Sequence, residues 1–219
     1  MASASEPHAI AATGLAASSS SDATADGPGV PPHADSETVF PVERLAMVAR
    51  WKPVHLGHAA VLRGLVDSAG HALIGIGSSN RYNIDNPFTA AETAAMIRSV
   101  LAGRDNYTLI EVPDLGNGPK WRLMVRDLCG PLQAFVTAND YVHGLMRDLY
   151  PVIHPARLVP PRERTRLSGT DVRRAILAGG DDWQRLVPRC VADYLCQNGL
   201  IERFRREFGA NAAPPTPQK

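Results

Sequence analysis

The sequence predicts an α/β fold in which a parallel sheet carries helices on both of its faces. Short apolar runs that read as strands alternate with segments of helical spacing through the middle of the chain. The connections between these segments are short, and such an alternation is typical of parallel sheets covered by helices. With 219 residues, the chain is long enough for one domain with a substantial core.

The predicted elements follow one another in a regular order. Strands are expected at residues 43–49, 71–77, 107–112 and 134–138. Helices are expected at residues 57–69, 89–103, 119–129, 140–149 and 168–180, and residues 183–208 supply two more. Residues 150–155 and 157–161 read as short extended pieces. Thr89 and Glu92 form the capping-box pattern, so the second helix should begin at Thr89.

Residues 1–43 are predicted to be a disordered extension. They are rich in Ala, Ser, Gly and Pro and have almost no large apolar side chains, so burial cannot offset the entropy of ordering them. They show neither the pattern of a secretory signal nor that of a transit peptide. Residues 210–219 are expected to be a loose tail, which leaves residues 44–209 as the folded domain.

Charge and cysteine content narrow the class of protein. Residues 44–219 contain all 23 Lys and Arg residues against 16 acids, a net charge of +7. This excess suits a polyanionic ligand such as a nucleotide, although surface charge without a function would look the same. Three cysteines without a CxxC pair indicate a reducing compartment, and we expect a cytoplasmic location. No apolar run approaches the ~18 residues that a membrane span needs.

The segment "ARWKPVHLGH" places His55 and His58 where the first strand gives way to a helix. A zinc site would need a third ligand, and helical zinc motifs usually space their histidines four apart. A serine hydrolase would need a nucleophile elbow such as GxSxG, which the chain lacks. A phosphate site has more support, because the free N–H groups of a helix start attract anions and Gly57 permits close approach. Arg50 and Lys52 would add positive charge beside it.

A second helix start with the same character follows more than a hundred residues later. In "RLSGTDVRRAI", Ser168, Gly169 and Thr170 open the helix and Arg173 lies in its first turns. A hydroxyl, a small residue and a guanidinium at a helix N-terminus suit an anion. Taken alone, this segment favours a capped, solvated surface helix with surface arginines. Two such starts in one α/β domain favour a phosphate-binding protein.

Together these segments resemble the HxGH nucleotidyltransferase superfamily, whose second signature reads like ISSTxxR. Within it, the chain is most similar to the archaeal-type nicotinamide mononucleotide adenylyltransferases. The resemblance covers about residues 45–208 and includes "IGIGSSN", "NPFTAAET", "VPDLGNGPKW", "FVTAND" and "LSGTDVRRAILAGGDDWQRLVP". It implies a Rossmann-like nucleotidyltransferase fold that moves AMP from ATP to nicotinamide or nicotinate mononucleotide, releasing pyrophosphate and forming NAD.

The resemblance also implies site residues. His55, His58 and Arg173 would be catalytic. The ATP contacts would come from Arg50, Lys52, His55, Gly57, His58, Asn139, Ser168, Gly169, Thr170 and Arg173. The pyridine mononucleotide would contact Trp121, Arg81 and Asn80. Mg²⁺ would be held by the ATP phosphates, with no metal ligand from a protein side chain and no structural metal.

The chain departs from the family pattern at four positions. Ala49, Trp51 and Lys52 stand where the family usually has Gly, a smaller side chain and Gln. Asp85 stands where the family commonly has a basic residue suited to the phosphate of the acceptor, and Arg81 is a candidate substitute. The acceptor could therefore differ.

Three functions follow as hypotheses. The first is the adenylyltransferase. The second is a related nucleotidyltransferase with another acceptor or with CTP, and the third is a non-catalytic sensor of NAD or ATP. We expect neither a nucleic acid nor a membrane as partner, and relatives of this fold are often homo-oligomers.

Overall fold

The computed structural model describes residues 40–209, and its central feature is a five-stranded parallel sheet. The strands are β1 (Val42–Ala49), β2 (Ala69–Gly77), β3 (Tyr107–Val112), β4 (Ala134–Val136) and β5 (Val152–Ile153). Their order across the sheet is β3-β2-β1-β4-β5, and every neighbouring pair is parallel. The predicted fold class, with a parallel sheet between helices, is confirmed.

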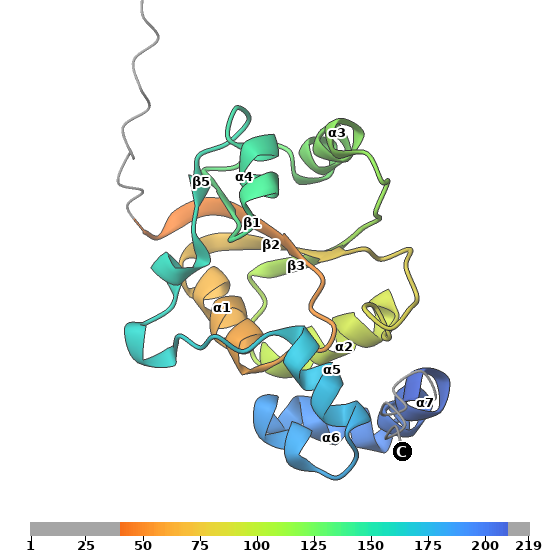
Figure 1. The fold of residues 1–219 in the computed structure, drawn as a ribbon. Coiled ribbons are helices and arrows are strands. Elements are labelled where there is room, and N and C mark those ends of the chain that lie inside the picture. The colour runs from red at the N-terminus through yellow and green to blue at the C-terminus, as the bar shows by residue number, and fades with distance from the viewer. Residues whose placement is uncertain (1–39, 210–219) are drawn as a thin grey trace, which may run out of the picture. The chain divides into compact units, whose positions relative to one another are not determined.

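Helices cover both faces of this sheet (Figure 1). One side carries α1 (Leu56–Asp67) and α2 (Ala90–Val100), and beyond them α5 (Gly169–Leu177), α6 (Arg189–Gln197) and α7 (Leu200–Phe208). The other side carries α3 (Gly118–Cys129) and α4 (Asp140–Met146). Three short 3₁₀ turns are η1 (Pro155–Leu158), η2 (Pro161–Glu163) and η3 (Asp182–Leu186).

Two apolar cores follow from the alternation of side chains along the strands. In β1, Leu45 and Met47 pack into the larger core with α1, α2 and the C-terminal helices. Ala46, between them, faces the smaller core under α3 and α4. Both faces of a parallel sheet must be covered, which explains why the strands read as almost continuous apolar runs.

Most predicted helix boundaries are close to those observed. Thr89 caps α2, and its capping box with Glu92 is present, as the pattern predicted. Gly179 and Gly180 follow α5 with φ angles of 87° and 66°, which matches the expected glycine stop.

The extended piece predicted at residues 157–161 is wrong. Its first two residues belong to η1, and η2 begins at its end. Proline occupies positions 155, 160 and 161, and its fixed φ suits tight turns. β1 begins at Val42, slightly before the predicted domain boundary. Residues 1–39 of the predicted extension and the predicted tail lie outside the described residues.

The order of the strands reverses at β1, and this reversal determines where a ligand site can form. The chain leaves β1 toward β2 on one side, whereas β4 pairs with β1 on the other side. The connections after β1 and β4 therefore diverge at the carboxyl edge of the sheet and leave a crevice, where such folds bind ligands. Within residues 40–209, no helix is long and apolar enough to cross a membrane.

Candidate active site

A cavity of about 730 Å³ opens at this carboxyl edge. Its walls come from the ends of β1, β2 and β4, from the loop before α3, and from the first turns of α3 and α4. The residues with predicted roles that line it are Arg50, Trp121 and Asn139. A cavity of this size can take a small nucleotide.

His55 and His58 are joined at the start of α1. His55 is the N-cap residue, and its Nδ1 accepts a hydrogen bond of 3.2 Å from the His58 backbone N–H. The two imidazole rings stack with their centroids 3.6 Å apart. The His58 Nδ1 lies 3.3 Å from the carbonyl oxygen of Pro53. The predicted pair is therefore one compact unit at a helix N-terminus, where anions are favoured.

Both histidines are held in the neutral form. Burial lowers the pKa of His55 to about 4, and the carboxylate of Asp171 opposes this shift. Burial, followed by the nearby His55 ring, also holds the pKa of His58 well below its ordinary value. Because both rings are neutral near pH 7, neither repels the other, and each keeps one N–H donor and one acceptor nitrogen.

The side chains of Trp51 and Lys52 are buried beneath this turn and do not extend into solvent. Trp51 is fully buried with a left-handed φ of 55°, and its indole N–H donates to the carbonyl of Gly75 at 2.9 Å. Lys52 is 1% exposed, and its Nζ donates to the carbonyl of Ser78 at 2.9 Å. Burial and the charge of Arg50 lower the pKa of the Lys52 ammonium. The predicted ATP ligand Lys52 thus ties the β1–α1 turn to the end of β2.

The two predicted helix starts meet. A Cβ atom added to Gly169 would lie 3.4 Å from the carbonyl oxygen of Lys52, which is ordinary van der Waals contact, so α5 begins directly against the histidine turn. Arg173 is buried, and its Nη1 donates to the same carbonyl at 3.1 Å. On the other side, a Cβ at Gly57 would lie 2.9 Å from the side chain of Thr165. The histidine turn and the start of α5 are therefore adjacent parts of one site.

The start of α5 carries a second capping box that the sequence interpretation missed. The Ser168 hydroxyl donates to Asp171 Oδ2 at 2.6 Å and accepts from the Asp171 backbone N–H at 3.3 Å. These bonds lower the pKa of the Asp171 carboxyl. The S-x-x-D pattern was present in the sequence and could have revealed it. Thr170 is also engaged, because its Oγ1 accepts from Arg173 Nη2 at 3.0 Å.

Trp121 and Asn139 lie on two elements that face the large cavity. Trp121 is half-buried in the first turn of α3 and lines the cavity wall. Asn139 is the N-cap of α4, where its Oδ1 accepts from the Val142 N–H at 3.0 Å. Tyr141, exposed on α4, also lines the cavity and had no predicted role.

Asn80 and Arg81 do not themselves line the large cavity. Asn80 exchanges two hydrogen bonds with the backbone of Asp114, at 2.8 and 3.0 Å. Arg81 Nε lies 3.5 Å from the Asp114 carboxylate. Asp114 does line the cavity, so the two predicted acceptor ligands lie at its rim and hold the β3–α3 loop in place.

The segment of residues 78–88, which we call the β2–α2 loop, reaches both parts of the site. Near its middle, Asp85 accepts a hydrogen bond of 3.0 Å from Arg173 Nη2. Burial lowers the pKa of Arg173, and the nearby Asp85 carboxylate opposes that shift. The pairing of Asp85 with the predicted phosphate ligand was not foreseen, because the two residues are 88 positions apart.

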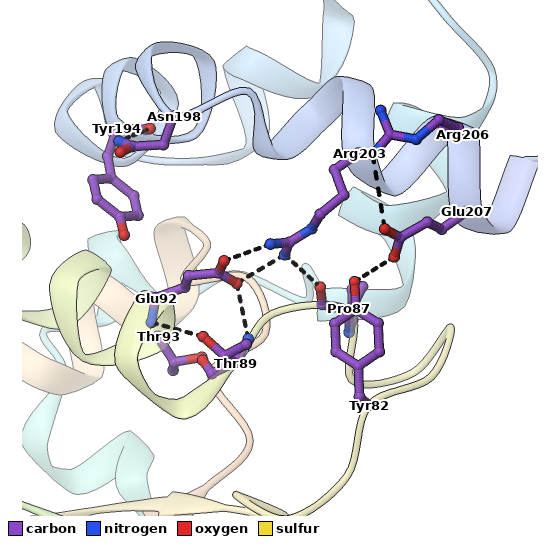
Figure 2. A network of polar contacts seen from close by, with 10 residues as sticks. All are labelled: Tyr82, Pro87, Thr89, Glu92, Thr93, Tyr194, Asn198, Arg203, Arg206 and Glu207. Atoms are coloured by element: carbon purple, nitrogen blue, oxygen red, sulfur yellow. Dashed lines mark hydrogen bonds and ion pairs between the residues drawn. The ribbon is translucent and has the colours of Figure 1, made fainter.

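The far end of the β2–α2 loop is anchored by α7 (Figure 2). Arg203 donates to both carboxylate oxygens of Glu92, at 2.5 and 2.8 Å, and to the Pro87 carbonyl at 3.1 Å. Its guanidinium also lies 5.8 Å from the centroid of the Tyr82 ring, whose hydroxyl donates to Glu207. The C-terminal helix thus holds the loop through one half-buried cation.

No metal cage is present among residues 40–209. No group of three or more His, Cys, Asp or Glu side chains there is placed to hold a metal ion.

Comparison with known proteins identifies relatives of this chain. No protein-family model matches the chain. A nicotinamide-nucleotide adenylyltransferase of Pyrobaculum neutrophilum is 32% identical over 178 residues, which cover 79% of this chain and 98% of the relative. The same enzyme of Methanococcus vannielii is 31% identical over 165 residues, which cover 74% of this chain and 94% of the relative.

A solved structure shares the fold. It is a bifunctional NMN adenylyltransferase/ADP ribose pyrophosphatase of Francisella tularensis, complexed with AMP and a manganese ion, and its TM-score is 0.55 at 18% identity. The match covers 81% of this chain but only 58% of that bifunctional protein. The predicted resemblance is confirmed by the relatives above 30% identity, which align over nearly their whole length. The chain therefore belongs to the nicotinamide-nucleotide adenylyltransferase family.

Proposed function

We propose that the protein transfers AMP from ATP to nicotinamide mononucleotide, releasing pyrophosphate and forming NAD. The observation that carries this proposal is the meeting of two anion-attracting helix starts beside the large cavity. Arg173 bridges them, since its Nη1 donates to the Lys52 carbonyl at 3.1 Å. The names of the relatives supply the reaction class.

The chemistry would need positioning and charge stabilisation more than proton transfer. An oxygen of the mononucleotide 5′-phosphate attacks the α-phosphorus of ATP in line. A new P–O bond forms, the bond from the α-phosphorus to the bridging oxygen breaks, and that oxygen leaves with pyrophosphate. The attacking phosphate is already ionised at neutral pH, so no general base is required. Catalysis then rests on holding the two phosphates in line and stabilising the charge of the leaving group.

The residues divide between the two substrates. His55, His58, Thr170 and Arg173 would hold the ATP phosphates, with the N–H groups at the starts of α1 and α5. Trp121 would provide an aromatic face for the cationic pyridinium ring, which favours stacking and cation–π attraction. Asn80 and Arg81 would contact the mononucleotide from the rim of the cavity.

A divalent cation would neutralise the ATP phosphates, and we propose Mg²⁺. The Francisella tularensis structure was complexed with a manganese ion, which supports a divalent metal in this fold. The cytoplasmic location stays a prediction from the sequence.

A pyrophosphate-release assay tests the proposal. ATP and CTP are each combined with nicotinamide mononucleotide, nicotinate mononucleotide and unrelated mononucleotides, with Mg²⁺ present. We expect turnover with ATP and a pyridine mononucleotide. Turnover only with CTP or with a different acceptor would favour the related nucleotidyltransferase. Binding without turnover in any combination would favour the sensor.

A further inference from the structure

The side chain of Arg173 makes three hydrogen bonds, and one of them goes to an acidic residue. Nη1 donates to the Lys52 carbonyl at 3.1 Å, and Nη2 donates to Thr170 Oγ1 at 3.0 Å. Nη2 also donates to Asp85 Oδ1 at 3.0 Å. A carboxylate thus occupies a donor of the guanidinium that would otherwise be offered to a phosphate.

Asp85 lies in a turn that is held by hydrogen bonds, and this turn directs its carboxylate toward Arg173. The side-chain oxygen of Asn83 accepts from the backbone N–H of Asp85 and from that of Asn86, each at 3.0 Å. It also accepts from the Asn86 side-chain amide at 3.0 Å, and Asn86 is buried. The two asparagines also exchange backbone hydrogen bonds of 2.8 and 3.2 Å. The carboxylate therefore projects from a defined turn in the β2–α2 loop.

The two partners differ sharply in exposure. The Arg173 side chain is 9% exposed, whereas the Asp85 side chain is 62% exposed. The bonds of Arg173 to Lys52 and Thr170 do not involve Asp85, so they can hold the guanidinium in place when Asp85 leaves. Asp85 can turn into water or toward the adjoining cavity of about 390 Å³. Breaking this ion pair therefore costs little free energy, because the Asp85 carboxylate is exposed to water, and it leaves the Arg173 side chain ordered.

We propose that Asp85 competes with the ATP phosphates for Arg173 and thereby sets the affinity for ATP. This inference rests on the proposed function, because it takes Arg173 as a phosphate ligand. Phosphate and carboxylate both accept hydrogen bonds from a guanidinium, and their like charges repel each other at short range. A bound triphosphate displaces the Asp85 carboxylate, and the turn at residues 83–86 separates from α5. ATP binding is thereby coupled to the loop that carries Asn80 and Arg81.

The test measures binding of a non-hydrolysable analogue, α,β-methylene-ATP with Mg²⁺, by calorimetry in the absence of an acceptor. Asp85→Asn keeps the shape of the side chain and removes its charge. We expect this variant to bind the analogue about five-fold more tightly, the upper size found for exposed ion pairs. Asp85→Glu keeps the charge and should bind much as the unmodified protein does.

Asp67→Asn is the matched control. Asp67 pairs with Arg104 at 2.6 Å, both side chains are about half exposed, and the variant makes the same change of charge. It should leave the affinity unchanged. Thermal unfolding without nucleotide checks that every variant is folded.

Two results would overturn the inference. Equal affinity for Asp85→Asn and the unmodified protein would show that Asp85 does not compete. Weaker binding would show that Asp85 supports Arg173 while ATP is bound. Neither result touches the proposed function, which is decided separately by whether the unmodified protein forms NAD from ATP and nicotinamide mononucleotide.

Discussion

At the scale of single residues, the two stacked histidines carry their proton on different ring nitrogens. The Nδ1 of His55 accepts from the His58 backbone, so the neutral ring carries its proton on Nε2 and can donate it. The Nδ1 of His58 lies beside the Pro53 carbonyl, which can only accept. That nitrogen must therefore carry the proton, which leaves Nε2 of His58 as an acceptor in the neutral ring.

This arrangement predicts proton uptake when ATP binds. A triphosphate beside His58 favours the charged imidazolium, and it raises a pKa that burial holds low in the free protein. Calorimetric titration of the ATP analogue near pH 7, in two buffers with different ionisation enthalpies, measures the protons taken up. We expect a clear buffer dependence that His58→Gln reduces. The same heat in both buffers would contradict the assignment.

Trp121 gives a second prediction at this scale. If it stacks on the pyridinium ring, Trp121→Ala should raise KM for nicotinamide mononucleotide about ten-fold or more, the size of a lost aromatic contact. KM for ATP should change little. Trp121→Phe keeps an aromatic face and should recover part of the loss. Equal rises in KM for both substrates would show that Trp121 is not part of the acceptor site.

At the scale of elements, α7 sets the position of the β2–α2 loop. Arg203 is 22% exposed and Glu92 17% exposed, so their two hydrogen bonds are partly shielded from water. Arg203→Gln should raise KM for the mononucleotide more than KM for ATP, because the loop that carries Arg81 loses its anchor. It should also lower the free energy of unfolding by about 2 kcal/mol.

Two further variants separate positioning from general stability. Arg203→Lys keeps the charge but loses the paired donors of the guanidinium. Its KM for the mononucleotide should therefore lie between the KM of the unmodified protein and that of Arg203→Gln. Arg189→Gln removes an arginine of α6 that is 94% exposed and should leave both KM values unchanged. A uniform fall in kcat without a KM difference would mean that Arg203 only stabilises the fold.

The elements were largely predictable from the sequence, whereas contacts between them were not. Strand and helix positions followed from local periodicity, and the cap at Thr89 followed from a pattern four residues long. The pairs Asp85–Arg173 and Glu92–Arg203 join residues 88 and 111 positions apart. Nothing in local spacing encodes which charges meet across a fold. Lys52 shows the same limit, since its charge suggested a phosphate ligand but its side chain is bonded to Ser78.

At the scale of the whole molecule, the buried histidines make stability depend on pH. Burial lowers the pKa of His55 to about 4 from an ordinary value of 6.5, so the unfolded chain binds more protons between those values. Its contribution is fully present above pH 6.5 and is lost as the pH falls toward 4. The loss from this group is about 3 kcal/mol.

Chemical denaturation at pH 7, 5.5 and 4 measures this loss. The carboxylate of Asp171 attracts protons to His55 and opposes the lowering of its pKa, while His55 in turn helps burial to lower the pKa of the stacked His58. His55→Gln can still accept a hydrogen bond at the helix start and should show a smaller fall over the same range. A stability that stays flat from pH 7 to 5 would contradict the buried neutral pair.

The burial of Lys52 has a practical consequence for chemistry on the protein's surface. Its amine is 1% exposed and bonded to a carbonyl, whereas Lys120 is exposed beside Trp121. These are the two lysines of residues 40–209. An amine-reactive fluorophore should therefore leave Lys52 unmodified and label Lys120. A dye on Lys120 would be attached next to Trp121, which lines the large cavity, and a change in its emission would report binding of the acceptor.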